Sequence, residues 1–289
     1  MSKIFSFSSN KEAALLLPSR PKRSCKGDFG RVLCVCGSYG MAGAAFLCAK
    51  AAYRSGTGLV EIFTHESNRI ILQTLLPEAI ITVYTDEYSE NDIIPSIEKA
   101  DCIISGCGLG TSQLSRKILS DILHKRGEKS LVLDADALNI ISRNTSLLKY
   151  AKGAIITPHA KEMERLCGKS VSDILSSTAE TASSFAQKHE LICVLKDHET
   201  IVSDGERIYK NTSGNSGMAT GGSGDVLAGI VGGLFAQIQN SNSDAFNLAT
   251  LAVYLHGLSG DIAAQKFGEF SLMANDIIDN LPNAFKLTE

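Results

Sequence analysis

The chain has 289 residues, of which 44% are hydrophobic and 20% are charged, and its net charge is −3 at pH 7. This composition is typical of a folded protein with a large core, and it excludes an intrinsically disordered chain. The pI of about 6.1 argues against a general nucleic-acid-binding protein, because such proteins normally present a basic face. A small phosphorylated ligand is compatible with this charge, since one pocket can be positive in an acidic protein.

The N-terminal sequence and the hydropathy pattern bear on location. Residues 1–16 contain no long apolar core and no cleavage site, so we expect no signal peptide. No window reaches the ~20 apolar residues that a membrane span needs. No linker, charge run or obvious repeat interrupts the chain. We therefore expect a cytoplasmic protein with a single domain over residues 1–289, and neither a membrane nor a nucleic acid as a partner.

The eight cysteines include no C-x-x-C pair. Cys34 and Cys36 alternate along a predicted strand, so both point to one face of it. Several of the others lie in apolar runs, where reduced, buried thiols are expected. These spacings give little support to a zinc site.

In chain order, short apolar runs rich in β-branched residues alternate with segments of helical length. The runs predict strands at 31–37, 58–64, 79–85, 101–106, 130–136, 153–158 and 191–196. Apolar residues at helical spacing predict helices at 41–56, 111–127 and 172–190. Strands that are apolar throughout and alternate with helices indicate a mostly parallel sheet covered on both faces.

The last third of the chain has a different pattern. Residues 200–205 and 207–212 predict a hairpin that turns at Asp204-Gly205, so the sheet should have an antiparallel edge. After Gly224 the pattern is purely helical, with helices expected over 225–239, 244–265 and 271–280. Because ligands of such sheets lie at the carboxyl ends of the strands, the residues just after each strand are the candidates for chemistry.

The segment "GGSGD" places Gly222 and Gly224 before Asp225 at a predicted helix start. Backbone N–H groups of a glycine-rich turn and a helix N-terminus form an anion site. A carboxylate there could accept the proton of an attacking hydroxyl while the N–H groups stabilise a transferring phosphoryl group. Asp225 could instead be an ordinary helix cap, although a cap alone does not need the preceding "GNSGMATGG".

"TPHAKEMERL" predicts a helix with Thr157 as its N-cap and Pro158 at its first position. His159 then lies in the first turn, where the helix dipole disfavours a positive charge, so it is either a neutral hydrogen-bonding group or simply solvated. Glu162 could do no more than complement the dipole.

Three further segments leave alternatives open. In "DADAL", Asp134 and Asp136 could hold Mg²⁺ through water, or Asp136 could cap the next helix. In "VLKDHET", Lys196 could meet a phosphate or be an ordinary surface lysine. "GCGLGT" could contact a ligand or form a tight turn, and its spacing differs from a dinucleotide-binding G-x-G-x-x-G. A P-loop motif is absent, and an isolated "DFG" at 28–30 is attributed to chance.

Taken together and in this order, several segments resemble one family. "GRVLCVCGSYGMAGAAFLCAKAAYRSGTGLV", "GCGLG", "DADALNII", "TPHAKEMERL" and "GNSGMATGGSGDVLAGIVGGLFAQ" are similar to the ADP/ATP-dependent NAD(P)H-hydrate dehydratases of the ribokinase-like superfamily. The resemblance covers roughly residues 27–260. It implies a three-layer α/β/α sandwich, whose mostly parallel central sheet has an antiparallel edge. Members often follow an epimerase domain, and this chain resembles the stand-alone dehydratase.

The resemblance also implies an activity. The enzyme would phosphorylate the unwanted hydroxyl of the S epimer of hydrated NADH or NADPH with ADP or ATP and Mg²⁺. It would then eliminate phosphate and restore the dinucleotide. We expect ADP as the donor, with AMP and phosphate as products. The family also suggests a homotetramer, with "AAFLCAKAAYRSG" in an interface.

Site residues follow from the matching motifs. The hydrate would contact Ala45, Gly110, His159 and Asp225. The adenine nucleotide would contact Lys196, Asp197, His198, Glu199, Thr200 and Gly224. Asp225 would act as the base, and the amides from Gly222 to Gly224 would hold the phosphoryl group.

Three positions depart from the family pattern: Cys107 and Ser216 stand where proline is usual, and Asp197 where glycine is typical. The charge of Asp197 bears most on the choice of donor. Two other functions remain as alternatives. A vitamin-precursor kinase of the same fold would stop at the phosphorylated product. A non-catalytic nucleotide sensor would not need the acid in "GGSGD".

Overall fold

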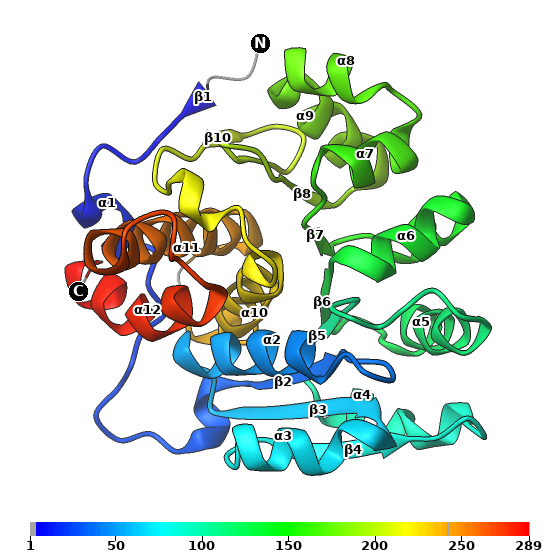
Figure 1. Cartoon of the computed structure of the whole chain (residues 1–289). Helices are drawn as coiled ribbons and strands as arrows, with labels where there is room; N and C mark the ends of the chain where they lie inside the picture. The colour runs from blue at the N-terminus through cyan, green and yellow to red at the C-terminus, as the bar shows by residue number, and fades with distance from the viewer. Residues whose placement is uncertain (1–3, 242, 289) are drawn as a thin grey trace.

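A computed structural model of the protein describes residues 4–241 and 243–288. Within these residues, ten strands form one sheet in the order β1-β10-β9-β8-β7-β6-β5-β2-β3-β4 (Figure 1). The strands are β1 Ile4–Phe5, β2 Arg31–Val35, β3 Leu59–His65, β4 Ile80–Tyr84, β5 Cys102–Ser105, β6 Ser130–Leu133, β7 Ile155–Ile156, β8 Ile192–Leu195, β9 Ile201–Ser203 and β10 Ile208–Lys210.

The α-helices are α1 Asn10–Ala14, α2 Ala42–Arg54, α3 Arg69–Leu75, α4 Ile94–Lys99, α5 Gln113–Lys125, α6 Ala135–Arg143, α7 Ala160–Cys167, α8 Val171–Ser176, α9 Thr178–His189, α10 Ser223–Phe235, α11 Ala245–Phe267 and α12 Ala274–Thr288. Short 3₁₀ helices are η1 Lys26–Phe29, η2 Glu66–Asn68, η3 Glu90–Asp92, η4 Thr145–Tyr150, η5 Ser216–Met218 and η6 Ile238–Asn240. Among the described helices, none is both long and apolar enough to cross a membrane.

The sheet separates two apolar cores, which gives the molecule three layers. Along β2, Val32 and Cys34 point into one core and Leu33 and Val35 into the other, because successive side chains of a strand face opposite ways. Helices α2, α10, α11 and α12 cover the first face, and α5, α6, α7 and α9 cover the second (Figure 1). The prediction of a mostly parallel sheet covered on both faces is confirmed.

The antiparallel edge is also confirmed. Strand β9 pairs antiparallel with both β8 and β10, while every pair from β8 to β4 is parallel. Gly205 in the turn has a φ of 98°, which a glycine adopts at little cost. One feature escaped prediction: β1 adds a parallel strand outside β10. A two-residue strand is too short to show a periodic pattern.

Two predicted helices need correction. The helix expected over 172–190 is two helices, α8 and α9, because Ser177 leaves the helical conformation with a φ of −144°. The final helix runs from Ala274 to Thr288 and includes Pro282, whereas the sequence predicted an end at 280. The predicted helices over 41–56, 111–127, 225–239 and 244–265 correspond to α2, α5, α10 and α11.

Candidate active site

Asp225 lies in the first turn of α10, whose N-terminus is open. The N-cap is Gly222, which has no side chain to accept a hydrogen bond from the first amides. The first N–H groups of a helix have no acceptor within the helix, so the amides of Gly224 and Asp225 are available to an anion. Asp225 is not the cap itself, and the cap interpretation of this residue is therefore wrong.

The glycines of this segment have different structural reasons. Gly222 has a φ of 91°, and a Cβ there would lie 2.4 Å from Leu47 Cδ1. A Cβ on Gly217 would meet the backbone of Glu269 at 2.6 Å. The start of the segment is fixed to α11, because the Gly214 amide and the Asn215 side chain both donate to Asp261. Gly222 and Gly224 are thus at the anion site, while the earlier glycines pack the loop that leads to it.

A buried ion pair lies opposite Gly224. Lys196 Nζ is 2.8 Å from Asp134 Oδ1, which also accepts a 2.7 Å hydrogen bond from Thr157. The Asp134 side chain is 2% exposed and that of Lys196 is 21% exposed, so Lys196 is not an ordinary surface lysine. A Cβ on Gly224 would lie 3.3 Å from Lys196 Nζ, which shows how closely the lysine approaches the helix start.

These neighbours set the electrostatics of Asp225. Burial raises the pKa of Asp225 to about 6, and the negative charge of Asp134 adds to the rise, while Cys107 and Lys196 oppose it. For Lys196, burial alone would lower the pKa, but Asp134 and Glu162 outweigh burial and raise it. At neutral pH the site therefore holds an ionised carboxylate beside a lysine cation, as a general base near a phosphoryl group requires.

His159 is the N-cap of α7, so it lies just before the first turn of this helix. The prediction that Thr157 caps the helix is therefore wrong. His159 Nδ1 accepts from the amides of Lys161 and Glu162, and the Glu162 carboxylate accepts from the His159 amide at 2.9 Å. A ring nitrogen that accepts from amides is unprotonated, and burial together with the charges of Lys196 and Arg165 lowers the pKa of His159. The neutral alternative is thus favoured over a solvated cation.

Glu162 does more than complement the helix dipole. Its side chain is 6% exposed, and burial raises its pKa to about 7, against the opposing charge of Lys196. An isolated bridge between His159 and Lys196 places the ends of the two neighbouring strands side by side. His159, Glu162, Lys196 and Asp134 therefore form one cluster at the carboxyl edge of the sheet.

Gly110 follows β5, and Ala45 lies in α2, the helix that follows β2. The Gly110 amide donates to Asp136 Oδ2 at 2.8 Å, and Gly110 has a φ of 75°. Asp136 thus anchors the turn after β5 and does not cap α6. Ala45, in the first turns of α2, is fully buried and packs against Gly37, where a Cβ would lie 3.0 Å from Ala45 Cβ. Gly110 is thus one hydrogen bond away from Asp136, whose charge helps to raise the pKa of Asp225, while the Ala45 side chain is buried.

The turn after β8 contains the remaining predicted nucleotide contacts. Thr200 Oγ1 donates to the Asp197 carbonyl, and Glu199 pairs with Lys210 at 2.6 Å. His198 is 79% exposed and lies 3.3 Å from Asp197 Oδ2, so these side chains pair with one another. Only Lys196 of this group joins the buried cluster.

The structure also gathers thiols that are distant in the sequence. The sulfur atoms of Cys36, Cys48 and Cys107 all lie within 4.8 Å of one another. The sulfur of Cys107 and one carboxylate oxygen each of Asp134 and Asp225 also lie within 4.8 Å of one another. Hydrogen bonding to Cys36, together with burial, raises the pKa of Cys107. Cys107 is thus a neutral thiol that lies beside both carboxylates, 3.9 Å from Asp134 Oδ2. All eight cysteines are free, and six are buried, as expected.

Two contacts of the site could not be found from the sequence. Lys196 and Asp134 are 62 positions apart, and no local pattern indicates that they pair. His256 of α11 lies 3.3 Å from Ser223 Oγ at the start of α10, and burial lowers its pKa to about 4. A lone histidine in a long apolar helix gives no signal of this contact.

Comparisons with known proteins show the family. The family model described as NAD(P)H-hydrate dehydratase matches residues 32–283. The chain belongs to the NAD(P)H-hydrate dehydratase family. The ADP-dependent (S)-NAD(P)H-hydrate dehydratase of Listeria monocytogenes is 34% identical over 272 residues, which cover 94% of this chain and 93% of that protein.

A second group of relatives is longer. The bifunctional NAD(P)H-hydrate repair enzyme Nnr of Coxiella burnetii is 35% identical over 267 residues, or 92% of this chain. The match covers 52% of that protein, so the chain spans about half the length of the bifunctional relatives.

Solved structures confirm the ribokinase-like fold. A ribokinase-like superfamily protein from Enterococcus faecalis superposes with a TM-score of 0.86 at 29% identity, covering 98% of this chain and 96% of its own. The ADP/ATP-dependent NAD(P)H-hydrate dehydratase from Bacillus subtilis, co-crystallised with ATP and Mg²⁺, gives 0.82 at 27% identity, covering 98% and 99%. The resemblance to this family seen in the sequence is therefore confirmed.

Proposed function

We propose that the protein is an ADP-dependent dehydratase for the S epimer of hydrated NADH or NADPH. The observation that supports this most strongly is Asp225, a carboxylate with a raised pKa at the open N-terminus of α10, facing the Lys196–Asp134 pair. The relative from Listeria monocytogenes, which is named for this reaction, matches over nearly its whole length. Residues 1–289 would form one domain, in the cytoplasm.

The chemistry divides into two steps. Asp225 takes the proton of the hydrate hydroxyl, whose oxygen attacks the terminal phosphorus of ADP, and AMP leaves. The amides of Gly224 and Asp225 hold the transferring group, with Lys196 next to them. In the second step the C–O bond breaks, the phosphate leaves, a ring proton is lost, and the ring double bond returns.

Two further groups of residues would position the two substrates. Ala45, Gly110 and His159 would contact the hydrate, with the Nε2 proton of neutral His159 as a donor and Ala45 acting through the backbone of α2. The turn from Lys196 to Thr200 would contact the nucleotide. Asp197 and Glu199 leave this turn without a net positive charge, which suits a donor with fewer phosphate charges. We infer that ADP is preferred to ATP.

We expect Mg²⁺ to bind next to Asp134. Asp134 Oδ2 is not used by Lys196 or Thr157, and Mg²⁺ in phosphoryl-transfer sites is held by one or two carboxylates together with substrate phosphates. The ion would neutralise phosphate charge. A homotetramer would place the partly exposed side chains of α2 near a neighbouring subunit.

Product analysis tests the proposal. The purified protein is incubated with hydrated NADH, Mg²⁺ and either ADP or ATP, and the products are separated by chromatography. We expect NADH, AMP and phosphate in equal amounts with ADP. A phosphorylated hydrate that accumulates without NADH would instead show the kinase alternative. Nucleotide binding with no turnover would show the sensor.

A further inference from the structure

A hollow lined by polar residues lies near the candidate active site and is not used by the chemistry above. It has a volume of about 560 Å³ and is lined by Thr111, Asn139, Ser142, Arg143 and Arg165. That size is within the range of small-molecule sites. Two of the five residues are arginines and none is acidic, so the lining is positive. Arginine guanidinium groups are the side chains best suited to bind phosphate.

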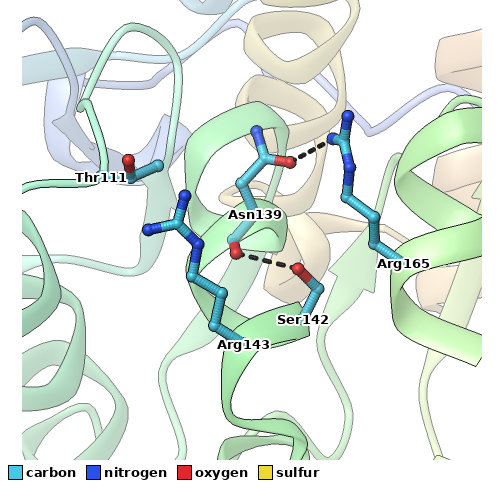
Figure 2. A pocket seen from close by; sticks show the side chains of 5 residues that line it. All are labelled: Thr111, Asn139, Ser142, Arg143 and Arg165. Atoms are coloured by element: carbon cyan, nitrogen blue, oxygen red, sulfur yellow. Dashed lines mark hydrogen bonds between the residues drawn. The ribbon is translucent and has the colours of Figure 1, made fainter.

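The arrangement of these side chains suits an anion. Figure 2 shows the guanidinium groups of Arg143 and Arg165 on either side of Asn139. Arg165 Nη1 donates to Asn139 Oδ1 at 2.7 Å, which orients this guanidinium and leaves its other N–H groups available. Asn139 and Arg143 are four residues apart on α6, so they lie one above the other on the same face of the helix.

A hydrogen-bond chain joins the hollow to Gly110. Asn139 Nδ2 donates to Asp136 Oδ1 at 3.3 Å, and the other oxygen of Asp136 accepts from the Gly110 amide at 2.8 Å. Thr111, which lines the hollow, directly follows Gly110. Arg165, which also lines the hollow, is close enough to His159 for its charge to help lower the pKa of His159. The hollow therefore borders Gly110, one of the residues assigned to the hydrate.

Its place in the sheet separates it from the nucleotide donor. Its lining comes from the segments that follow β5, β6 and β7, whereas Lys196 and the turn assigned to the nucleotide follow β8. A ligand that extends from Asp225 past Gly110 would reach the hollow without crossing the donor position. Hydrated NADH and NADPH extend in this way, with phosphates away from the reacting ring.

We propose that the hollow between Arg143 and Arg165 binds a phosphate group of the dinucleotide substrate. This inference rests on the proposed function, because it takes the hydrate as the ligand of the neighbouring residues. Two sources share this chemistry: the pyrophosphate, present in both hydrates, and the 2′-phosphate, present only in hydrated NADPH. The two arginines would fix the substrate at its non-reacting end and would make no contact with the transferring phosphoryl group.

The test uses Arg143→Gln and Arg165→Gln, with Arg23→Gln as a matched control, because Arg23 is exposed and precedes β2, whereas the hollow lies beyond the carboxyl ends of the strands. Contacts made equally in the ground state and the transition state change KM and leave kcat unchanged. We expect KM for the hydrate to rise on the order of tenfold in each hollow variant, with kcat kept and no change in the control.

A binding measurement separates this proposal from the proposed function. NADH and NADPH are titrated against each variant, and binding is followed by the fluorescence of the reduced ring. Weaker binding of both dinucleotides assigns the hollow to the pyrophosphate, and weaker binding of NADPH alone assigns it to the 2′-phosphate. Dehydratase activity with KM and dissociation constants that match the control would overturn the proposal. Arginine-dependent binding without turnover would support it and reject the proposed function.

Discussion

At the scale of single residues, Asp225 links the structure to a pH dependence. Burial raises its pKa to about 6, and a general base works only when it is ionised. We expect kcat/KM to fall about tenfold per pH unit below pH 6 and to level off above it. A pH profile between 4.5 and 8 measures this limb.

Glu162 provides the control for this profile, because burial raises its pKa to about 7 in the same cluster. In Glu162→Gln the acid limb should stay near pH 6 if Asp225 is the base. A limb that disappears in this variant would assign the titration to Glu162 instead.

Lys196 and Asp134 form the buried pair, and removing one partner leaves the other charge without compensation. Lys196→Met should lower the free energy of unfolding by about 2 kcal/mol, since Thr157 continues to donate to Asp134. The same variant should bind ADP more weakly. Urea unfolding and an ADP titration measure the two effects.

The matched control is Lys152→Met. Lys152 pairs with Glu190 on the surface, where both side chains are more than 60% exposed, and such pairs contribute little to stability. An equal loss of stability in both lysine variants would argue against a special role for the buried pair.

At the scale of elements, the start of α10 depends on one glycine. Gly222→Ala places a methyl group 2.4 Å from Leu47 Cδ1, at a φ of 91° that L residues rarely adopt. We expect a loss of stability of about 1–3 kcal/mol and a large loss of activity, because the amides of the helix start would move. Thermal unfolding and turnover are the measurements.

Gly221→Ala is the control for Gly222→Ala, because it makes the same change of residue type at the neighbouring position. A Cβ on Gly221 would meet nothing within 4 Å. Gly221→Ala should therefore keep both stability and most of the turnover. If the two alanine variants behave alike, the geometry of Gly222 is not the reason for this segment.

At the scale of the whole molecule, the sequence predicts more of the fold than of the site. Strands that are apolar along most of their length, such as β5 and β6, indicate a parallel sheet, because both faces of such strands are buried. The residues by themselves gave the site only as separate motifs, and it was the family resemblance that grouped Gly110, His159 and Asp225. Most of these motifs follow a strand and "GGSGD" follows a loop, but the sequence does not show which strands are neighbours.

The wrong prediction of the N-cap of α7 has a local cause. Threonine is a common N-cap and proline a common first residue, so Thr157-Pro158 indicated an earlier start. His159 takes the cap instead because its ring nitrogen accepts two amide hydrogens and Glu162 completes a capping box. The gathering of Cys107 beside Asp225 depends on the packing of distant elements and has no local signal either.

The packing of α10 on α2 joins the site to the core of the molecule. A Cβ on Gly229 would lie 2.2 Å from the Cys48 carbonyl oxygen, although alanine is the better helix former. We expect Gly229→Ala to lower the free energy of unfolding by about 1–3 kcal/mol, because it overpacks this contact. Gly43→Ala is the control, because a Cβ there meets nothing within 4 Å, and it should leave stability unchanged or raise it. Thermal unfolding of both variants distinguishes helix packing from helix propensity.

The most direct test of Asp225 as the general base is the turnover of Asp225→Asn, which keeps the shape of the side chain and removes the base. Hydrated NADH, ADP and Mg²⁺ are supplied to both proteins, and the return of NADH absorbance is followed, with circular dichroism to show that the variant is folded. We expect kcat to fall at least about a hundredfold while the fold and ADP binding persist. Near-normal turnover in the folded variant would contradict it, and the proton would then have to leave by another route.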